Sequence, residues 1–248
     1  MSATFVTVQS QRAFEEIETQ VRKLIATGQL KPGDRLPSER ALSTQLAVSR
    51  NTLREALRSL EIAGLVELRK GSAGGAFISA GKPQVIVNAL SDLYQLGAIN
   101  AQQLTEARVW IESLIVRVVC ERATEEALAE LECNVSQAVA AEKAGENFKR
   151  SMLHLEFHSL LARATRNPLL TIAMDGIMGI MREFVLTLGI PEKSDSLLIP
   201  SRKRLLTYLR ARDADAAEDE VGKHLKRVHK NYLSRMNGRG SAAQSSPR

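Results

Sequence analysis

LKPGDRLPSERALSTQLAVSRNTLREALRSLEIAGLVELRKGSAGGAFI, residues 30–78, is the stretch that decides the fold of the first part of the chain. Pro32-Gly33 forces a turn, because neither residue readily continues a helix. Ser38 then stands where its side chain can cap a short helix over residues 39–46. Ser49 repeats this arrangement after a tight connection, so a second helix is expected to begin there.

The second of these helices is expected to end at Gly64. Residues 65–69 and 76–79 are two short β-prone runs separated by a glycine-rich turn, which is typical of a β-hairpin. Upstream, apolar residues recur every three or four positions over residues 11–27, which predicts an amphipathic helix. Helix, short helix, tight turn, helix and hairpin is the order of elements in a winged helix-turn-helix.

We therefore expect a winged helix-turn-helix over residues 10–80, with residues 81–83 (Gly-Lys-Pro) as a linker. No strand pattern follows, so the chain is mainly α, and an antiparallel all-helical bundle of six or seven helices is expected over residues 85–235. The Gly/Ser/Ala-rich tail, residues 237–248, is expected to be disordered. The predicted helices of the bundle cover residues 84–96, 101–122, 124–144, 147–165, 168–189, 196–212 and 213–235.

Positive charge is concentrated towards the two ends of the sequence. The formal net charge is +6, and residues 1–82 carry 12 basic against 8 acidic residues, whereas residues 83–229 carry 18 against 20. A small basic domain beside a larger, nearly neutral one fits nucleic-acid binding combined with a second task. Aromatic residues make up only 4% of the chain, which argues against a stacking platform for single-stranded nucleic acid.

Cys120 and Cys133 are the only cysteines, and they lack CxxC spacing. This usage favours two reduced thiols over a disulfide or a zinc–thiolate site. The N-terminus shows no basic region followed by an apolar run, and no apolar stretch is long enough to span a bilayer. We therefore expect a soluble, cytoplasmic protein with no membrane partner.

The helix that begins at Ser49 is the candidate DNA-reading element. Arg50 and Arg54 are four residues apart and share one face, while Asn51 and Thr52 lie at the N-terminal end, where such helices contact bases. Arginine reads guanine edges in the major groove through two hydrogen bonds. A surface helix whose arginines only pair with nearby glutamates has the same spacing, so the surrounding order of elements is what favours DNA binding.

Arg40 on the preceding helix, and Lys70 and Gly71 at the hairpin tip, are placed to contact phosphates or the minor groove. The segments PGDRLPSER and VSRNTLREAL are the most specific part of a stretch that resembles the N-terminal domain of GntR-family bacterial regulators, without a gap over residues 10–80. The resemblance implies that operator DNA is contacted by Arg40, Ser49, Arg50, Asn51, Thr52, Arg54, Lys70 and Gly71.

The helical remainder resembles the effector-binding domain of the FadR-like, FCD-type branch of that family. The resemblance is carried by LTEARVWIESLIVRVVCERATEEALAELE, FHSLLARATRNPLL and YLRARDADAAEDEVGKHL, and it extends from about residue 85 to 235. It implies a helical bundle that binds a small carboxylate metabolite, in many members together with a divalent metal held by an Asp and three His. The candidate effector-binding residues are then Arg108, His154, His158, Asn167, Arg202 and His224.

The sequence departs from that metal pattern at two positions, with His154 where the Asp is usual and Arg202 where a His is usual. His154 and His158 have the i, i+4 spacing that lets one helix present two imidazoles to one ion, and His224 would complete a set suited to Zn²⁺ or Ni²⁺. A guanidinium beside a dication is repelled, so Arg202 can instead bind the anionic ligand or replace the metal. A metal site, a metal-free anion site and a purely structural role all remain open.

Arg108 lies on a helix with an apolar face and can enter the bundle, where it would grip a carboxylate through two hydrogen bonds. The alternative is an exposed salt bridge with Glu112 at i+4. Asn167 precedes Pro168 and is expected to cap the next helix, whether or not it also contacts a ligand.

Together these features predict a repressor that binds a palindromic operator as a homodimer and is released by a small carboxylate effector. One alternative is a metal-responsive regulator. Another is a metal-dependent enzyme built on His154, His158 and His224. Glu156 lies on a different helix face from the two neighbouring histidines, so the HExxH arrangement is absent and catalysis is not favoured.

Overall fold

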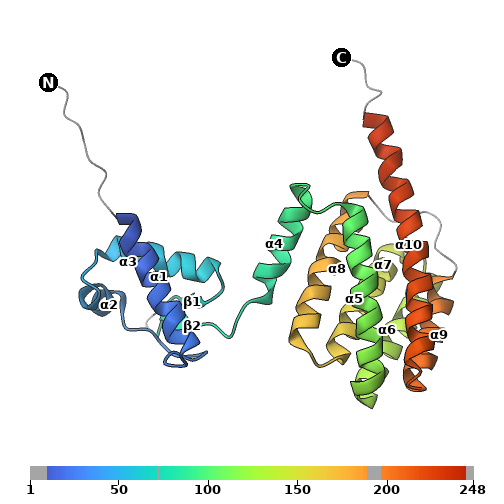
Figure 1. Cartoon of the computed structure of the whole chain (residues 1–248), viewed down its shortest axis with the longest axis horizontal. Coiled ribbons are helices and arrows are strands. Elements are labelled where there is room, and N and C mark those ends of the chain that lie inside the picture. The colour runs from blue at the N-terminus through green and yellow to red at the C-terminus, as the bar shows by residue number, and fades with distance from the viewer. Residues whose placement is uncertain (1–9, 72, 189–196, 244–248) are drawn as a thin grey trace. The chain divides into compact units, whose positions relative to one another are not determined.

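The computed structural model describes residues 10–71, 73–188 and 197–243 (Figure 1). The chain divides into two compact units, Met1–Val85 and Ile86–Arg248. Helices dominate both units, and the described residues form one small two-stranded antiparallel sheet. The predicted fold class, a mainly α chain with a winged helix-turn-helix and a helical bundle, is confirmed.

The first unit contains three helices followed by a hairpin. Helix α1 packs along α3, α2 packs against the same helix, and α3 also contacts β1. The elements are α1 (Ser10–Ala26), α2 (Glu39–Gln45), α3 (Arg50–Ile62), β1 (Val66–Arg69) and β2 (Gly75–Ile78).

Both serine caps form as predicted. Ser38 Oγ accepts a hydrogen bond from the backbone N–H of Ala41 at 3.2 Å, and Ser49 Oγ accepts one from the N–H of Thr52 at 3.0 Å. Between the two helices, Ala47 has a φ of +54°, in the left-handed region that L-residues other than glycine and asparagine rarely adopt. This single residue makes the sharp turn from α2 into α3 and so sets the angle between the two helices.

The hairpin is fixed from both sides. Residues 34–36 pair with the edge of β2 opposite β1, and the N–H of Leu36 donates to the carbonyl of Ala76 at 2.8 Å. The guanidinium of Arg35 donates to the carbonyl of Gly74 at 2.5 Å. A β-carbon on Gly74 would collide with the backbone of the hairpin, so glycine is required there. These contacts hold the β1–β2 hairpin, the wing of the winged helix-turn-helix, against residues 34–36, which precede α2.

The core of the first unit consists of the apolar faces that the sequence pattern identifies. Helices α1 and α3 contribute most of it, and both strands contribute one or two residues each. The buried members are Ile17, Val21, Leu36, Leu53, Ala56, Leu57, Leu60, Val66, Ala76 and Ile78.

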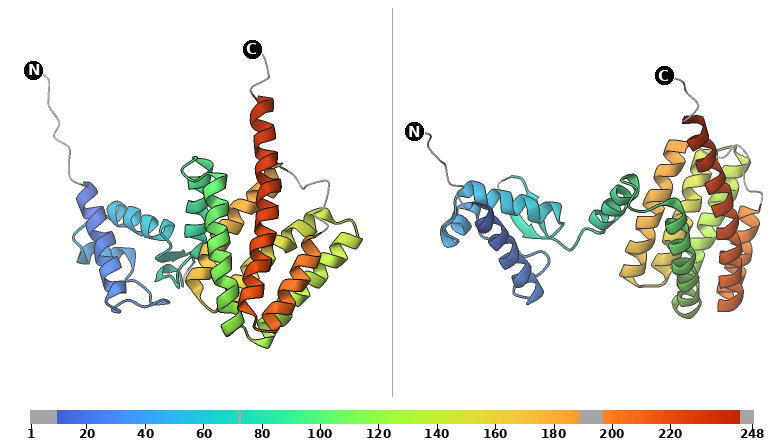
Figure 2. Two further views of the ribbon diagram at one scale, coloured as in Figure 1. Left: turned by 45° about the vertical axis from the view of Figure 1, so that its right-hand side comes forward. Right: turned by 45° about the horizontal axis from the view of Figure 1, so that its top comes forward.

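The second unit is a bundle in which α6 packs along α7, α7 along α8, and α10 along both α5 and α9 (Figure 2). The residue just after Gly81-Lys82 already starts a helix, so the predicted linker ends in the first residue of α4. The elements are α4 (Pro83–Gln95), α5 (Ala101–Arg122), α6 (Glu125–Lys143), α7 (Asn147–Ala164), α8 (Pro168–Leu188), α9 (Leu198–Arg210) and α10 (Ala214–Ala243).

Helix α4 approaches α8 closely because α8 has glycines at the contact. A β-carbon on Gly179 would lie 3.1 Å from a Val87 methyl group, and one on Gly176 would overlap the Leu90 side chain. Tyr94 and Phe184 extend this contact with an edge-to-face ring pair whose centroids are 5.1 Å apart. Helix α4 is thereby packed onto the bundle through most of its length.

Helices α5 and α7 are buried on more than one face. Charged and polar side chains of both helices consequently lie in the interior of the bundle. Burial of such groups is unfavourable unless they form hydrogen bonds or ion pairs. The largest fully buried apolar side chains around them are Ile115, Leu128, Leu131, Phe157, Leu161, Met174, Ile180, Leu209 and Leu225.

The C-terminal end differs from the sequence-based expectation. Disorder was expected for residues 237–248 on composition, whereas helix α10 continues to Ala243. Alanines in this segment favour a helix. Extending an existing helix also avoids the free-energy cost of nucleation, a contribution that the composition of the segment does not reveal. The last five residues lie outside the described part, as does the predicted helix break at Gly189–Pro191.

A matched pair of substitutions on α3 tests this core. Leu60 is fully buried, whereas Ile62, two residues later, is 78% exposed. We expect Leu60→Ala to lower the free energy of unfolding of the first unit by about 2–5 kcal/mol because it leaves a cavity, and Ile62→Ala to change it by less than about 0.5 kcal/mol. Urea unfolding followed by circular dichroism measures both. Equal losses would contradict the assigned packing.

Candidate functional site

The predicted DNA-contacting side chains lie exposed on the first unit. Arg50, Asn51 and Arg54 are exposed at the N-terminal half of α3, and Arg40 is exposed on α2. Lys70 and Gly71 are exposed where β1 enters the turn of the hairpin. No described side chain buries these groups, so all of them are accessible to a duplex.

Ser49 and Thr52 are engaged at the start of α3. Their hydroxyl groups lie 2.8 Å apart, and Ser49 also accepts the Thr52 N–H. The cap holds the first turn of the helix, the turn from which a major-groove helix contacts bases. Their structural contribution is therefore to fix the end of the helix that carries Arg50 and Asn51.

Arg54 has a partner that the sequence did not reveal. Its guanidinium donates to Glu39 Oε2 from both Nε, at 3.3 Å, and a terminal nitrogen, at 2.7 Å, although both side chains stay about half exposed. This hydrogen bond raises the pKa of Arg54. Glu39 lies 15 residues earlier on α2, so no helical spacing relates it to Arg54, and the suggested nearby partner was a glutamate of α3 itself. Glu39 is thus a residue that holds the Arg54 side chain in place before DNA binds.

The second unit contains a cluster of buried charged and polar side chains. Four helices contribute to it, and one of them, α5, contributes two residues at i, i+4 spacing. We call this set the polar cluster: Arg108 and Glu112 on α5, His158 on α7, Arg202 on α9, and His224 on α10.

His158 joins three of these helices. Its Nδ1 lies 2.6 Å from Glu112 Oε2, and its Nε2 lies 2.7 Å from a terminal nitrogen of Arg108 and 2.8 Å from one of Arg202. A carboxylate only accepts and a guanidinium only donates. The imidazole must therefore carry its proton on Nδ1 and accept both guanidinium groups at Nε2.

The protonation states in the cluster follow from burial and from these partners. Burial lowers the pKa of His158 to about 3, despite the opposing effect of Glu112, so the ring is neutral at pH 7. Burial alone would raise the pKa of Glu112, but its partners His158 and Arg108 outweigh burial and hold the pKa well below its usual range. Since His158 is neutral, the attraction that keeps Glu112 ionised comes from the Arg108 charge.

Arg108 points into the bundle and pairs with Glu112 through a 2.6 Å hydrogen bond. The alternative from the sequence was an exposed salt bridge between the same residues. The pair exists, but its side chains are only 5% and 1% exposed. Glu112 is therefore a member of the buried site and not a surface partner.

Arg202 is the second guanidinium of the cluster. It donates to the backbone carbonyl of His154 at 3.2 Å and to His158, and it lies 3.9 Å above the Phe157 ring. Burial lowers the pKa of Arg202 to about 9, which shows how poorly its charge is solvated. Its Nε has no hydrogen-bond partner.

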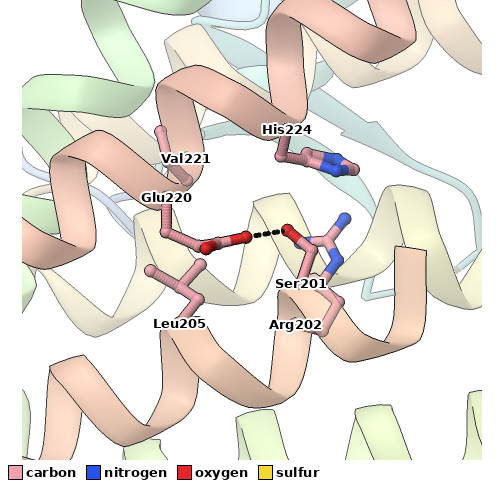
Figure 3. Close-up of a pocket in the computed structure, with 6 residues that line it drawn as sticks. All are labelled: Ser201, Arg202, Leu205, Glu220, Val221 and His224. Atoms are coloured by element: carbon pink, nitrogen blue, oxygen red, sulfur yellow. Dashed lines mark hydrogen bonds between the residues drawn. The ribbon is translucent and has the colours of Figure 1, made fainter. Parts of the chain in front are cut away.

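A small cavity lies beside Arg202, between α9 and α10 (Figure 3). Its polar wall includes Ser201, which donates to Glu220 at 2.5 Å. Glu220 is further paired with both edges of Arg204, at 2.8 and 2.9 Å. His224 closes the cavity on the α10 side, and its ring stacks on that of His158 with centroids 6.0 Å apart. Sequence reasoning missed Ser201 and Glu220, because nothing in their spacing separates them from surface residues.

Two predicted site residues contribute less than expected. His154 offers its backbone carbonyl to Arg202, while its side-chain Nε2 has no partner. Burial, with the Arg202 and Arg150 charges, lowers the pKa of His154 to about 2. Asn167 caps α8, as predicted, by accepting the N–H of Leu169 at 3.0 Å. Among the described residues it has no hydrogen bond to the polar cluster.

The polar cluster does not fit a divalent metal. Within the described ranges, no three His, Cys, Asp or Glu side chains converge as metal ligands. Nε2 of His158, the nitrogen that would face an ion, already accepts from two guanidinium groups. A cation about 4 Å from such a group meets roughly 4 kcal/mol of repulsion per unit of its charge at an effective dielectric of 20. The proposed set of His154, His158 and His224 is therefore not arranged for Zn²⁺ or Ni²⁺.

Comparison with known proteins agrees with both units. The family model described as "Bacterial regulatory proteins, gntR family" matches residues 13–77, and "FCD domain" matches residues 103–227. The HTH-type transcriptional regulator LutR of Bacillus subtilis is 29% identical over 83% of this chain and 94% of its own. The Galactonate operon transcriptional repressor of Escherichia coli is 30% identical, over 79% and 86%. A GntR structure from Streptococcus agalactiae has a TM-score of 0.65 at 28% identity, covering 88% of this chain and 99% of that one.

A winged helix-turn-helix combined with a helical domain that encloses a polar site defines a DNA-binding regulator with a separate ligand-binding domain. The chain belongs to the GntR family of transcriptional regulators and carries an FCD effector-binding domain. The family and these relatives are transcription regulators, not enzymes. Across the described residues, no helix has the length and apolar character needed to cross a membrane.

The buried histidines make stability depend on pH in a defined direction. In the unfolded chain each imidazole binds a proton near pH 6.5. Burial moves the folded pKa of His158 to about 3 and that of His154 to about 2, and it lowers the pKa of His224 well below its usual value. Below pH 6.5 the unfolded chain therefore binds more protons, and stability falls.

We expect the stabilising effect of each histidine to be complete above about pH 6.5 and to fall by about 1.4 kcal/mol per pH unit below it. Melting temperatures measured from pH 7.5 to pH 5 test this, with His154→Gln as the comparison, because that change removes one titrating group whose side chain has no hydrogen bond. The variant should show a shallower decline. A melting temperature that stays constant over this range would contradict the neutral assignment.

Proposed function

We propose that the chain is a transcriptional repressor that binds a palindromic operator as a homodimer and releases it when a small carboxylate metabolite binds in the FCD domain. The observation that carries this proposal is the pair of buried guanidinium groups, Arg108 and Arg202, which lie beside a single buried carboxylate, Glu112, in the interior of the domain. Buried charge is costly unless a partner compensates it, and two guanidiniums facing one imidazole favour an anionic ligand.

The reading half of the proposal rests on α3 and the wing. Arg50 and Arg54 would read base edges in the major groove, with Asn51 beside them. Arg40 and Lys70 would contact phosphates and set the register of the protein on the duplex. Two such helices in a symmetric dimer would meet the two half-sites of a palindrome, since the symmetry of the protein and of the site coincide.

The class of effector is supported by the chemistry of the site and by one relative. Arg202 Nε is a buried donor without a partner, whereas both ring nitrogens of His158 are already occupied by Glu112 and two guanidinium groups. One relative is named a galactonate operon repressor, and galactonate is a sugar acid with a single carboxylate. Arg202 and His224 are therefore the residues that we propose contact the acid, with Arg108 and His158 beside them in the polar cluster.

The DNA-reading assignment is tested with a duplex selected in vitro from random sequences by the wild-type protein. Arg50→Ala and Arg54→Ala should each lose about 1–3 kcal/mol of discrimination between the selected duplex and one with changed bases. Arg163→Ala removes the same charge from an exposed position in the helical unit and should leave discrimination unchanged. Retained sequence preference in both α3 variants would rule out their role.

The effector assignment is tested by the affinity for the same duplex in the presence of acids. Galactonate, gluconate, lactate and acetate are added to the full-length protein at constant ionic strength, with and without a chelator. At least one acid should weaken operator binding by about tenfold or more, a typical size for allosteric coupling. If no acid changes operator affinity or the melting temperature, the ligand-sensing half of the proposal fails and the DNA-binding half remains.

A further inference from the structure

The charges of the polar cluster do not balance. Arg108 is compensated by Glu112, with which it forms a 2.6 Å hydrogen bond. Arg202 forms no salt bridge with a carboxylate in the described part of the chain, and its two acceptors, the His154 carbonyl and His158 Nε2, are neutral. Only 4% of Arg202 is exposed to solvent. With His158 and His224 neutral, the two guanidinium groups share one carboxylate, Glu112, and the cluster keeps one net positive charge.

Two buried nitrogens beside this charge also lack partners. They are Nε of Arg202, a donor, and Nδ1 of His224, a residue that is 4% exposed. Both residues line the cavity between α9 and α10, and Figure 3 shows the Arg202 guanidinium rising from α9 towards the side of α10 that carries His224. Burial lowers the pKa of His224 well below its usual value, so the ring is neutral, and one of its tautomers carries a proton on Nδ1.

The remaining wall of the cavity limits what can occupy it. Ser201 and Glu220 satisfy each other at 2.5 Å, and Glu220 is further neutralised by Arg204 at 2.8 Å, so neither is left to recruit a cation. Leu205 and Val221 supply apolar surface. The open positions are therefore the Nε edge of Arg202 and, in the tautomer protonated there, Nδ1 of His224, next to hydrocarbon. These donors suit a carboxylate, but the closed cavity has room for about one water molecule, so an acid has to part α9 from α10 as it binds.

We propose that Arg202 takes the place of a metal ion in this FCD domain, so that a monocarboxylate binds to Arg202 Nε and His224 Nδ1 without any metal and neutralises the cluster. This inference rests on the proposed function and specifies its ligand as singly charged and its site as metal-independent. Arg202 acts by two means, because it binds the acid and its charge also occupies the lone pair of His158 that an ion would need.

The first test is metal content, which needs no knowledge of the effector. Full-length wild type, Arg202→His and Arg202→Gln are each incubated with excess Zn²⁺ or Ni²⁺, desalted and analysed for bound metal. Replacing the guanidinium with an imidazole places a third histidine beside His158 and His224, a set suited to either ion once Arg108 turns from His158 Nε2 to its ion-pair partner Glu112. We expect well under one equivalent in wild type and in Arg202→Gln, and about one equivalent in Arg202→His.

Each departure from that pattern is decisive. One equivalent in wild type that is lost in His224→Gln would overturn the proposal, because the metal would then occupy the site beside Arg202. No metal in a folded Arg202→His protein would also count against it, because the guanidinium would not be what excludes the ion. Circular dichroism establishes that each variant is folded before its metal content is measured.

The second test is the response of the melting temperature to carboxylates. Galactonate, gluconate, lactate and acetate are compared with sodium chloride at equal ionic strength, using Arg210→Gln as the matched control. Arg210 lies on the same helix as Arg202 but is ion-paired with Glu125 and Glu132, outside the cavity, and is 42% exposed. Wild type and Arg210→Gln should gain several degrees with at least one acid, and Arg202→Gln should lose that gain, with affinity weakened about 10- to 100-fold.

Without any ligand the order should reverse. Arg202→Gln should melt a few degrees above wild type because it removes the excess buried positive charge, whereas Arg210→Gln, which breaks surface ion pairs, should melt no higher than wild type. An Arg202→Gln protein that melts below wild type and responds to acids like wild type would overturn the assignment. So would the failure of every acid to stabilise wild type more than Arg202→Gln.

The outcomes separate this inference from the proposed function. If acids release the operator equally well from wild type and Arg202→Gln, the protein is an acid-responsive repressor and the role of Arg202 is wrong. If acids stabilise the protein only when Arg202 is present but leave operator affinity unchanged, the site is correct and the regulatory proposal is wrong.

Discussion

The neutral imidazole of His158 is the interaction on which the helical domain depends. One ring, buried on α7, donates to Glu112 of α5 and accepts from guanidinium groups of α5 and α9. Both nitrogens of the ring are used: loss of Glu112 would leave the buried Nδ1–H unsatisfied, which costs about 1–3 kcal/mol, whereas Nε2 keeps one donor if either guanidinium is removed. This arrangement couples α5, α7 and α9 through a single side chain. A ligand that draws one guanidinium away from His158 therefore changes the contacts of all three helices.

Much of the fold was predictable because it depends on local chemistry. Ser38 and Ser49 cap helices wherever the following residues are helical, and the glycines at positions 64 and 74 mark turns that no other residue readily makes. The buried faces of α1 and α3 follow from periodicity alone. The end of α10 was not predictable in this way, since a run of small and polar residues is ambiguous when it continues an established helix.

The site was predictable in its residue types but not in its wiring. Spacing and family resemblance identified Arg108, His158, Arg202 and His224, and burial confirms that all four lie in the interior. Spacing and resemblance did not reveal that Glu112 is buried with Arg108. Nor did they reveal the ion pair between Glu39 and Arg54, which are 15 residues apart in the sequence. Both of these acids pair through tertiary structure, where sequence separation carries no information about distance. The same limit leaves the choice between metal and anion open in the sequence, because the two guanidiniums that oppose a metal at His158 lie on other helices.

A buried charge without a counter-ion is difficult to explain as a device for stability. A neutral residue in place of Arg202 would make the free protein more stable. The same helix can pair a guanidinium with a carboxylate, as Arg204 does with Glu220 two positions along. A domain of this kind lies near the lower limit of stability that function allows, and groups that cost stability persist where they contribute to binding. A ligand that neutralises Arg202 would stabilise the folded state, because only the folded state forms its site. It would also favour whichever arrangement of α5, α7 and α9 brings it closest to the Arg202 charge. The buried charge destabilises the free protein, and its neutralisation by an acid would release that free energy. Part of it could then drive a conformational change that alters the operator affinity of the winged helix-turn-helix.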